Sequence, residues 1–140
     1  MDFPFFNRPA LKTIVVTGKE AAGEQARQLV AGIVSELPDL LLCYVADLAS
    51  GGTLAAYTAT RAYNPHKLSL RNARVFELLA QPLAAHPWLG GPLQDLVVVL
   101  DEQLHYLRPC QGGKWYCFVA MPAADANLGV VKAVVRRYVG

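Results

Sequence analysis

The segment WYCFVA, residues 115–120, constrains the fold more than any other part of the chain, because it is apolar on both faces of a strand. Successive side chains of a strand point to opposite sides of the sheet. One side would carry Trp115, Cys117 and Val119, and the other Tyr116, Phe118 and Ala120. Such a strand lies near the centre of a sheet or is covered on both faces. We expect the chain's own helices to cover only one face of this sheet.

The composition indicates a surface that binds another protein. Of the 140 residues, 54% are hydrophobic and 17% are charged, against a usual charged share of about 25%. A single domain of this length buries roughly 70% of the surface of its unfolded chain. With so few charged residues, the surface that stays exposed must include many apolar side chains. The formal net charge of +2, with scattered basic residues, disfavours nucleic acid as the partner.

Several features favour a cytoplasmic protein. The three cysteines, Cys43, Cys110 and Cys117, lack the spacing of a disulfide framework and fit a reducing compartment. Pro4 and Pro9 interrupt the N-terminal segment, which has no continuous apolar core of a signal peptide. No uncharged apolar run reaches the roughly 18 residues that span a bilayer, so we expect no membrane insertion.

The order of the predicted elements indicates an α+β fold with an antiparallel sheet. Residues 1–18 are expected to form an N-terminal arm, in which 11–17 are a short strand or an extended docking segment, and residues 19–140 form the domain. The first helix is expected to begin at a capping box of Thr17 and Glu20 and to end at Pro38. The later elements are a hairpin over 40–48 and 53–60, a helix over 65–80, strands over 94–100, 103–109 and 114–120, and a helix from about 124.

The helix over 65–80 has clear signals at both ends. Asn64 is a good capping residue, and proline suits the first helical position that Pro65 occupies. Pro82, Pro87 and the pair Gly90 and Gly91 are expected to break the chain, with at most one further short helical turn over 83–88. The predicted buried stripe of this helix consists of Leu68, Val75, Phe76 and Leu79.

The final helix contains a glycine, Gly129, in its first turns, where glycine costs about 1 kcal/mol relative to alanine. We expect this glycine to let the helix approach the sheet closely, while burial of Leu128, Val131, Val135 and Tyr138 offsets the cost. The alternative is an anion site at the start of the helix, which the charge of Asp125 would oppose.

The element order and three segments resemble the roadblock (dynein light-chain) family, in its bacterial stand-alone form. The segments are SELPDLLLCYVADLASGGTLAAY, LVVVLDEQLHYLRP and DANLGVVKAVVRRY. The third is the most specific, because Asn127, Leu128 and Gly129 precede apolar positions and two basic residues, as in the family's closing helix. The resemblance covers about residues 19–139 and implies a five-stranded antiparallel sheet in the order α-β-β-α-β-β-β-α, with helices on its faces. Asp39 and the turn over 47–52 depart from the family's pattern, which weakens the transfer of a particular partner.

The resemblance also implies a homodimer. Roadblock-like proteins pair the third strand of each subunit across a two-fold axis and pack the second helices side by side. The corresponding segments are residues 96–100 and 70–79, and the expected interface residues are Leu70, Val75, Leu78, Leu96, Val98 and Leu100. The family's members look like scaffolds or regulators of small Ras-like GTPases, which implies such a partner in contact with Arg71, Arg74 and Glu77.

Two other functions stay open at this point. One is a peptide- or protein-binding adaptor without a GTPase, which would use the aromatic residues Phe3, Phe5 and Phe6 of the arm. The other is a small-molecule sensor or an enzyme of related topology, which would need a closed and partly polar pocket.

No motif in the sequence carries catalytic or metal-binding chemistry. QGGKW lacks the glycine five positions before Gly113 and has Trp115 where a phosphate loop has Ser or Thr. Ser50 lies between two predicted strands instead of at a strand-to-helix elbow. His105, Cys110 and Cys117 lack the short paired spacing of a zinc site. We therefore expect a non-enzymatic protein with no catalytic residue, cofactor or metal.

Overall fold

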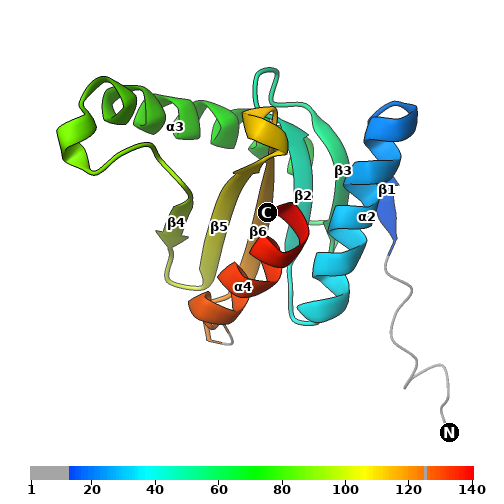
Figure 1. The fold of residues 1–140 in the computed structure, drawn as a ribbon. Coiled ribbons are helices and arrows are strands. Elements are labelled where there is room, and N and C mark those ends of the chain that lie inside the picture. Colours follow the sequence, from blue (N-terminus) through cyan, green and yellow to red (C-terminus); the bar gives the residue numbers. More distant parts are fainter. Residues whose placement is uncertain (1–12, 125) are drawn as a thin grey trace, which may run out of the picture.

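The computed structural model describes residues 13–124 and 126–140, which form a single antiparallel sheet with helices on it (Figure 1). The strand order is β1-β3-β2-β6-β5-β4. The strands are β1 Ile14–Val16, β2 Leu42–Asp47, β3 Thr53–Thr58, β4 Leu96–Val99, β5 Gln103–Cys110 and β6 Trp115–Pro122. The long helices are α2 Glu20–Glu36, α3 Pro65–Ala85 and α4 Leu128–Val139. The α+β antiparallel class is confirmed, but the sheet has six strands and not five.

The sixth strand is β1, which lies within the segment 11–17 and extends the sheet beyond β3. Ile14 pairs with Tyr57, and Val16 pairs with Ala55. The hydroxyl of Thr17 donates to the carbonyl oxygen of Thr53, so it is used to hold β1 and does not cap α2. The predicted capping box is therefore wrong, and α2 begins after Lys19 without a side-chain cap. The aromatic arm lies outside the described residues.

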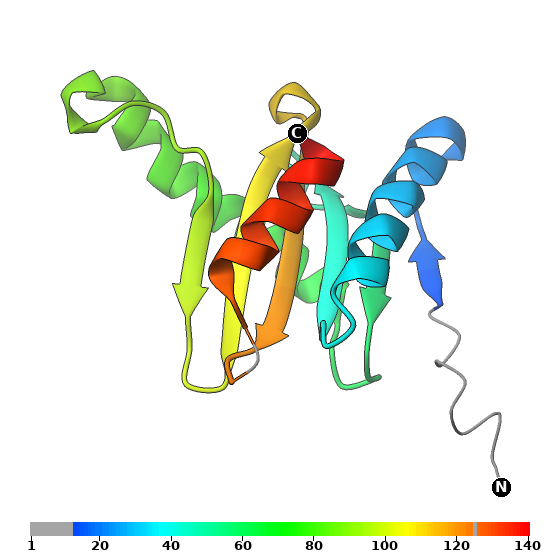
Figure 2. The same ribbon diagram turned by 60° about the horizontal axis from the view of Figure 1, so that its bottom comes forward.

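Helices cover both faces of the sheet, as both views show (Figures 1 and 2). α2 and α4 pack on one face, where fully buried Cys117 belongs to the core, and α3 packs on the other, where Tyr116 is fully buried. The prediction of a strand that is apolar on both sides is confirmed, because β6 lies between β2 and β5. The expectation that only one face would be covered is wrong, since α3 crosses to the opposite face.

The closest helix packing occurs at Gly32 and not at Gly129. A Cβ atom on Gly32 would lie 2.3 Å from the ring of Tyr138, so this glycine lets α2 and α4 meet. A Cβ atom on Gly129 would meet only the Oδ1 atom of Asn127, at 3.3 Å, and Gly129 is exposed. The expected close approach at Gly129 is therefore wrong. α4 begins at Leu128, and its cap is Asn127, whose side chain accepts a hydrogen bond from the amide of Val130.

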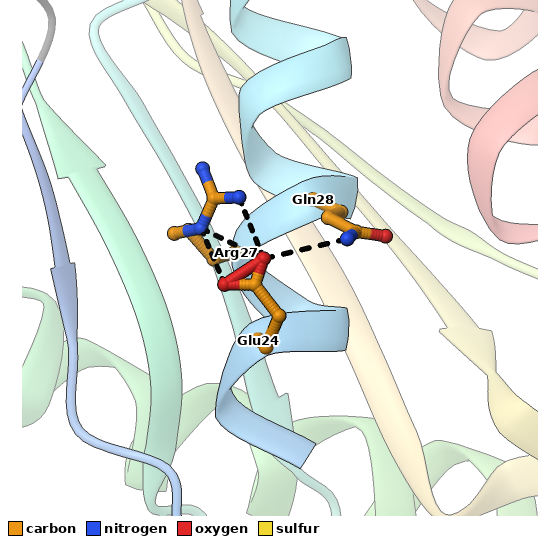
Figure 3. A network of polar contacts seen from close by, with 3 residues as sticks. All are labelled: Glu24, Arg27 and Gln28. Carbon is orange, nitrogen blue, oxygen red and sulfur yellow. Dashed lines mark hydrogen bonds and ion pairs between the residues drawn. The ribbon is translucent and has the colours of Figure 1, made fainter. Parts of the chain in front are cut away.

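The solvent-facing side of α2 carries charges that are paired with one another (Figure 3). The Nη2 atom of Arg27 lies 2.6 Å from Glu24 Oε2, and Gln28 donates to the same carboxylate at 3.3 Å. Exposed pairs of this kind contribute little to stability, because water and salt screen their attraction. By contrast, the charged side chains of α3 form no ion pair with the described residues.

Candidate protein-binding surface

The strand β4 forms one edge of the sheet, and no other strand of the described residues pairs with its outer side. Its inner side pairs with β5, with Leu96 opposite Leu107 and Val98 opposite His105. The third strand of the predicted domain is thus an edge strand with unpaired backbone groups. Unpaired edges of this kind are templates for pairing with another chain.

A cluster around Asp95, the residue before β4, holds this edge in place. The Tyr106 hydroxyl donates to Asp95 Oδ2 at 2.6 Å, and burial raises the pKa of this tyrosine to about 12, so the donor stays protonated. Arg108 and Arg136 approach the same carboxylate oxygen at 3.4 and 3.7 Å. Because Tyr106 and Arg108 belong to β5 and Arg136 to α4, the start of β4 is fixed to two neighbouring elements.

The first half of α3 is fixed on the sheet by a buried chain of hydroxyl groups. The Tyr116 hydroxyl donates to the backbone oxygen of Ser69, and Asn72 Nδ2 donates to the Tyr44 hydroxyl at 2.9 Å. The two tyrosine oxygens lie 2.8 Å apart, and since Tyr116 uses its proton on Ser69, Tyr44 must donate to Tyr116. Burial raises the pKa of both tyrosines, so both keep their protons.

The second half of α3 runs beyond the sheet (Figure 1), and residues 77–85 are exposed or only partly covered. The helix does not break at Pro82 as predicted but continues to Ala85, followed by a short 3₁₀ turn, η1 Pro87–Leu89. Proline removes one backbone hydrogen bond in a helix, and here the helix is exposed, so water can bind the free carbonyl. The separate helical turn expected over 83–88 is therefore wrong in its position, because residues up to Ala85 continue α3 and the short turn lies at Pro87–Leu89.

This overhanging part and the β4 edge carry the large apolar side chains with the highest exposed fractions among the described residues. Leu78 is 71% exposed, Val99 74% and Trp88 79%. We call this surface the apolar ridge, and it consists of Val75, Leu78, Leu79, Trp88 and Leu89 together with Val98 and Leu100. Val99 is also exposed but points to the opposite face of β4, because side chains alternate along a strand. A run of exposed apolar side chains on neighbouring elements is typical of a protein-binding surface.

The buried face of α3 differs from the predicted stripe. Ser69, Ala73 and Phe76 are buried, whereas Val75 and Leu79 are exposed and Leu68 is only partly covered. The predicted stripe is confirmed at Phe76, and Leu68 packs against the same core, but the stripe is wrong at Val75 and Leu79. A serine and an alanine face the sheet in their place. This shift moves Val75 and Leu79 to the apolar ridge.

The residues predicted for the dimer interface lie at two places. Leu78, Val98 and Leu100 are exposed and belong to the apolar ridge, together with Val75. Leu96 is partly buried in the core beneath α3.

Leu70 is exposed but lies against Gly51 in the hairpin turn, where a Cβ atom would come within 2.7 Å of Leu70. Gly51 has a positive φ of 76°, which suits glycine and leaves room for the helix. Trp88, Leu89 and Val99 were not predicted, although the proline and the two glycines around Trp88 signal an exposed turn.

The predicted partner-binding residues are all exposed, and two of them line different hollows. Arg71 lines a hollow of about 270 Å³ together with Lys67. Glu77 lines another, of about 570 Å³, with Asp47 and Lys114. Arg74 is exposed without lining either hollow. The structure therefore does not gather Arg71 and Glu77 into one patch.

No group of His, Cys, Asp or Glu side chains within residues 13–124 and 126–140 is arranged to hold a metal ion. No helix among the same residues is long and apolar enough to cross a membrane.

An antiparallel sheet that is covered by two helices on one face and by one long helix on the other defines a roadblock fold, as the comparison with solved structures shows. The chain is similar to a Roadblock/LC7 domain from Streptomyces avermitilis, at 16% identity over 81% of this chain and 90% of that chain, with a TM-score of 0.68. It is also similar to the gliding protein MglB from Thermus thermophilus, at 20% identity over 94% of this chain and 91% of that chain, with a TM-score of 0.68. An MglB with a tetrameric arrangement gives the same identity and coverage with a TM-score of 0.69. No protein-family model and no curated protein matches the chain.

Proposed function

We propose that the protein is a non-enzymatic homodimeric scaffold or regulator that binds a partner protein, and that this partner is a small Ras-like GTPase. The observation that carries the proposal is the apolar ridge beside an unpaired strand edge. The roadblock fold and the similarity to MglB structures support the choice of a regulator.

A second copy of the chain fits the ridge and the edge together. Pairing β4 with β4 of the second copy would satisfy the free backbone groups and give a continuous sheet. The two-fold axis would bring the two overhanging helices together, so that Leu78 and Val98 are covered by the same residues of the other subunit. A tetrameric arrangement of an MglB supports assembly from copies in this fold.

The other sheet edge, β1, is a weaker candidate for dimerisation. Its exposed residues, Val15 and Val16, are comparable to Val98 in exposure. However, β1 has only three residues, and the second half of α3, which carries exposed Leu78 and Leu79, runs past the opposite edge of the sheet (Figure 1).

Sedimentation velocity on three forms of the chain tests the dimer. We expect the wild type to sediment as a dimer and Val98→Lys to raise the dissociation constant at least about tenfold, because a lysine charge would be buried. The matched control is Val15→Lys, which puts the same charge on the opposite edge strand and should leave the dimer intact. A monomeric wild type at high concentration, or dissociation by Val15→Lys alone, would refute the assignment.

The GTPase partner is tested by charge reversal on α3. Arg71 and Arg74 are exposed, and neither forms an ion pair within the described part of the chain. We expect Arg71→Glu combined with Arg74→Glu to weaken pull-down of a Ras-like GTPase from the native cell, because the GTPase surface would meet the wrong charge. Lys19→Glu, a charge reversal at the start of α2, is the control. Unchanged capture by the double variant would contradict this partner surface.

A further inference from the structure

The first half of α3 borders a hollow whose charges are all of one sign. Its volume is about 270 Å³. Its less exposed lining residues, Leu42, Tyr63 and Leu68, form the floor, and exposed Lys67 and Arg71 form the rim. No acidic residue lines it among the described residues. We call it the basic hollow. The charge of Arg71 also reaches His105, whose pKa is lowered mainly by burial and to a smaller extent by this charge.

The two cations stay unpaired at positions where they cost helix stability. Lys67 lies in the first turn of α3, which contains no acidic residue, and the positive end of the helix dipole disfavours a cation there. Arg71 follows four residues later, so the two like charges are neighbours on the helix surface. Neither forms an ion pair with any described residue, whereas Arg27 on α2 is paired with Glu24.

The attraction for an anion comes from these side chains and not from the helix end. Asn64 Oδ1 already accepts hydrogen bonds from the amides of His66 and Lys67, at 3.1 and 3.4 Å. The floor of the hollow is apolar and fixed, since Leu42 is buried in the sheet and the Tyr63 hydroxyl accepts from Gln103 at 3.4 Å. A ligand must therefore combine negative charge with an apolar group.

We propose that the basic hollow binds an acidic peptide segment of a partner protein, with one apolar side chain on the floor and carboxylates at Lys67 and Arg71. The volume lies below the roughly 300–1,000 Å³ of drug-sized ligand pockets, which favours a side chain of a peptide over a free small molecule. The cationic rim is complementary to carboxylates that flank such an anchor. The inference rests on the proposed function only in requiring a partner protein, and it does not require a GTPase.

Fluorescence anisotropy with a short labelled peptide of alternating glutamate and leucine tests the proposal. We expect saturable binding that weakens as salt is raised, and no binding of the same peptide with glutamine in place of glutamate. Lys67→Glu and Arg71→Glu should each weaken binding about tenfold, which corresponds to about 1.4 kcal/mol. Ala62→Trp, which fills the hollow without changing its charge, should also weaken binding, because Ala62 is exposed on its wall.

Lys19→Glu is the matched control and should bind the peptide like the wild type. Equal binding of the glutamine peptide, or an equal loss in Lys19→Glu, would overturn the proposal, as would the absence of binding at high peptide concentration. Binding that requires a phosphorylated peptide or an anionic vesicle would also overturn it. Sedimentation and GTPase capture on the same samples separate this result from the proposed function, because either can fail while the other holds.

Discussion

Gly23 in α2 tests whether the helices are placed correctly against the N-terminal strand. A Cβ atom at this buried position would lie 2.4 Å from the carbonyl oxygen of Gly18 and 2.9 Å from Val16 Cγ1. The nearest obstacle is backbone, which cannot rotate away as a side chain can. Overpacking of this kind costs about 1–3 kcal/mol, and alanine recovers up to about 1 kcal/mol of helix propensity. Because the obstacle is backbone, the cost should lie in the upper part of that range, at about 2–3 kcal/mol, and after the gain in helix propensity Gly23→Ala should lower the free energy of unfolding by about 1–2 kcal/mol.

Gly129→Ala is the matched control, because it is the same exchange in a helix where only the cap side chain of Asn127 is near. We expect it to be neutral or to stabilise by up to about 1 kcal/mol. Urea unfolding, compared at one protein concentration because dimerisation contributes to stability, gives both values from the midpoint at constant slope. If Gly23→Ala proves as stable as the wild type, or if Gly129→Ala is the more harmful of the two, the assigned helix packing is wrong.

Three further predictions concern buried groups. Tyr116→Phe leaves the backbone oxygen of Ser69 without its donor, so we expect a loss of about 1–3 kcal/mol in urea unfolding, and an unchanged midpoint would contradict the hydroxyl chain. Burial lowers the pKa of His105 below its ordinary 6.5, so the folded state favours the neutral ring. The contribution of His105 to the free energy of unfolding should be fully present above pH 6.5 and be lost as the pH falls through the lowered pKa. His105→Gln should reduce that loss in thermal melts recorded across this range, and a variant with the same pH dependence would refute the role of His105. Burial raises the pKa of Cys110 to about 12, and because all three cysteines are buried, a thiol reagent at about pH 8 should label the chain only on unfolding; rapid native labelling would contradict this burial.

The parts of the fold that were predicted correctly depend on local signals. The turn at Asp101 and Glu102 separates β4 from β5 as expected, and Asn64 with Pro65 marks the start of α3. The apolar pattern of β6 predicted its central place, because no edge strand could bury both faces. In each case the residues whose pattern predicts the element also form it: Asn64 itself caps α3, and the apolar side chains of β6 are themselves buried.

The errors arise where a residue makes a long-range contact that its neighbours in sequence do not reveal. Thr17 has the spacing of a capping residue, yet its hydroxyl bonds to Thr53 in another strand. Gly129 was interpreted by its position in a helix, but the close contact is made by Gly32, whose partner Tyr138 is far away in sequence. Pro82 was expected to end α3, but the helix is exposed there and tolerates a missing hydrogen bond.

The same limits apply to the candidate site. The resemblance supplied Leu78, Val98 and Leu100, which the structure exposes on the apolar ridge. It did not indicate Trp88, because the length of α3 beyond Pro82 decides that exposure. The resemblance also did not predict that Arg71 and Glu77 line different hollows, because each hollow is formed by the loops that one side of α3 contacts.

Because helices cover both faces of the sheet, the apolar surface that a partner would cover lies at the edge of the sheet. A surplus of apolar residues was expected to leave one face of the sheet bare, and that face is instead filled by Phe76, Ala73 and their neighbours on α3. Covering it requires a helix that crosses the sheet diagonally, and its second half then runs past the last strand (Figure 2). The exposed side chains of Leu78 and Trp88 are thus a consequence of how the core is closed. Because β4 also leaves its outer backbone groups unpaired at this edge, a single interface there can cover both.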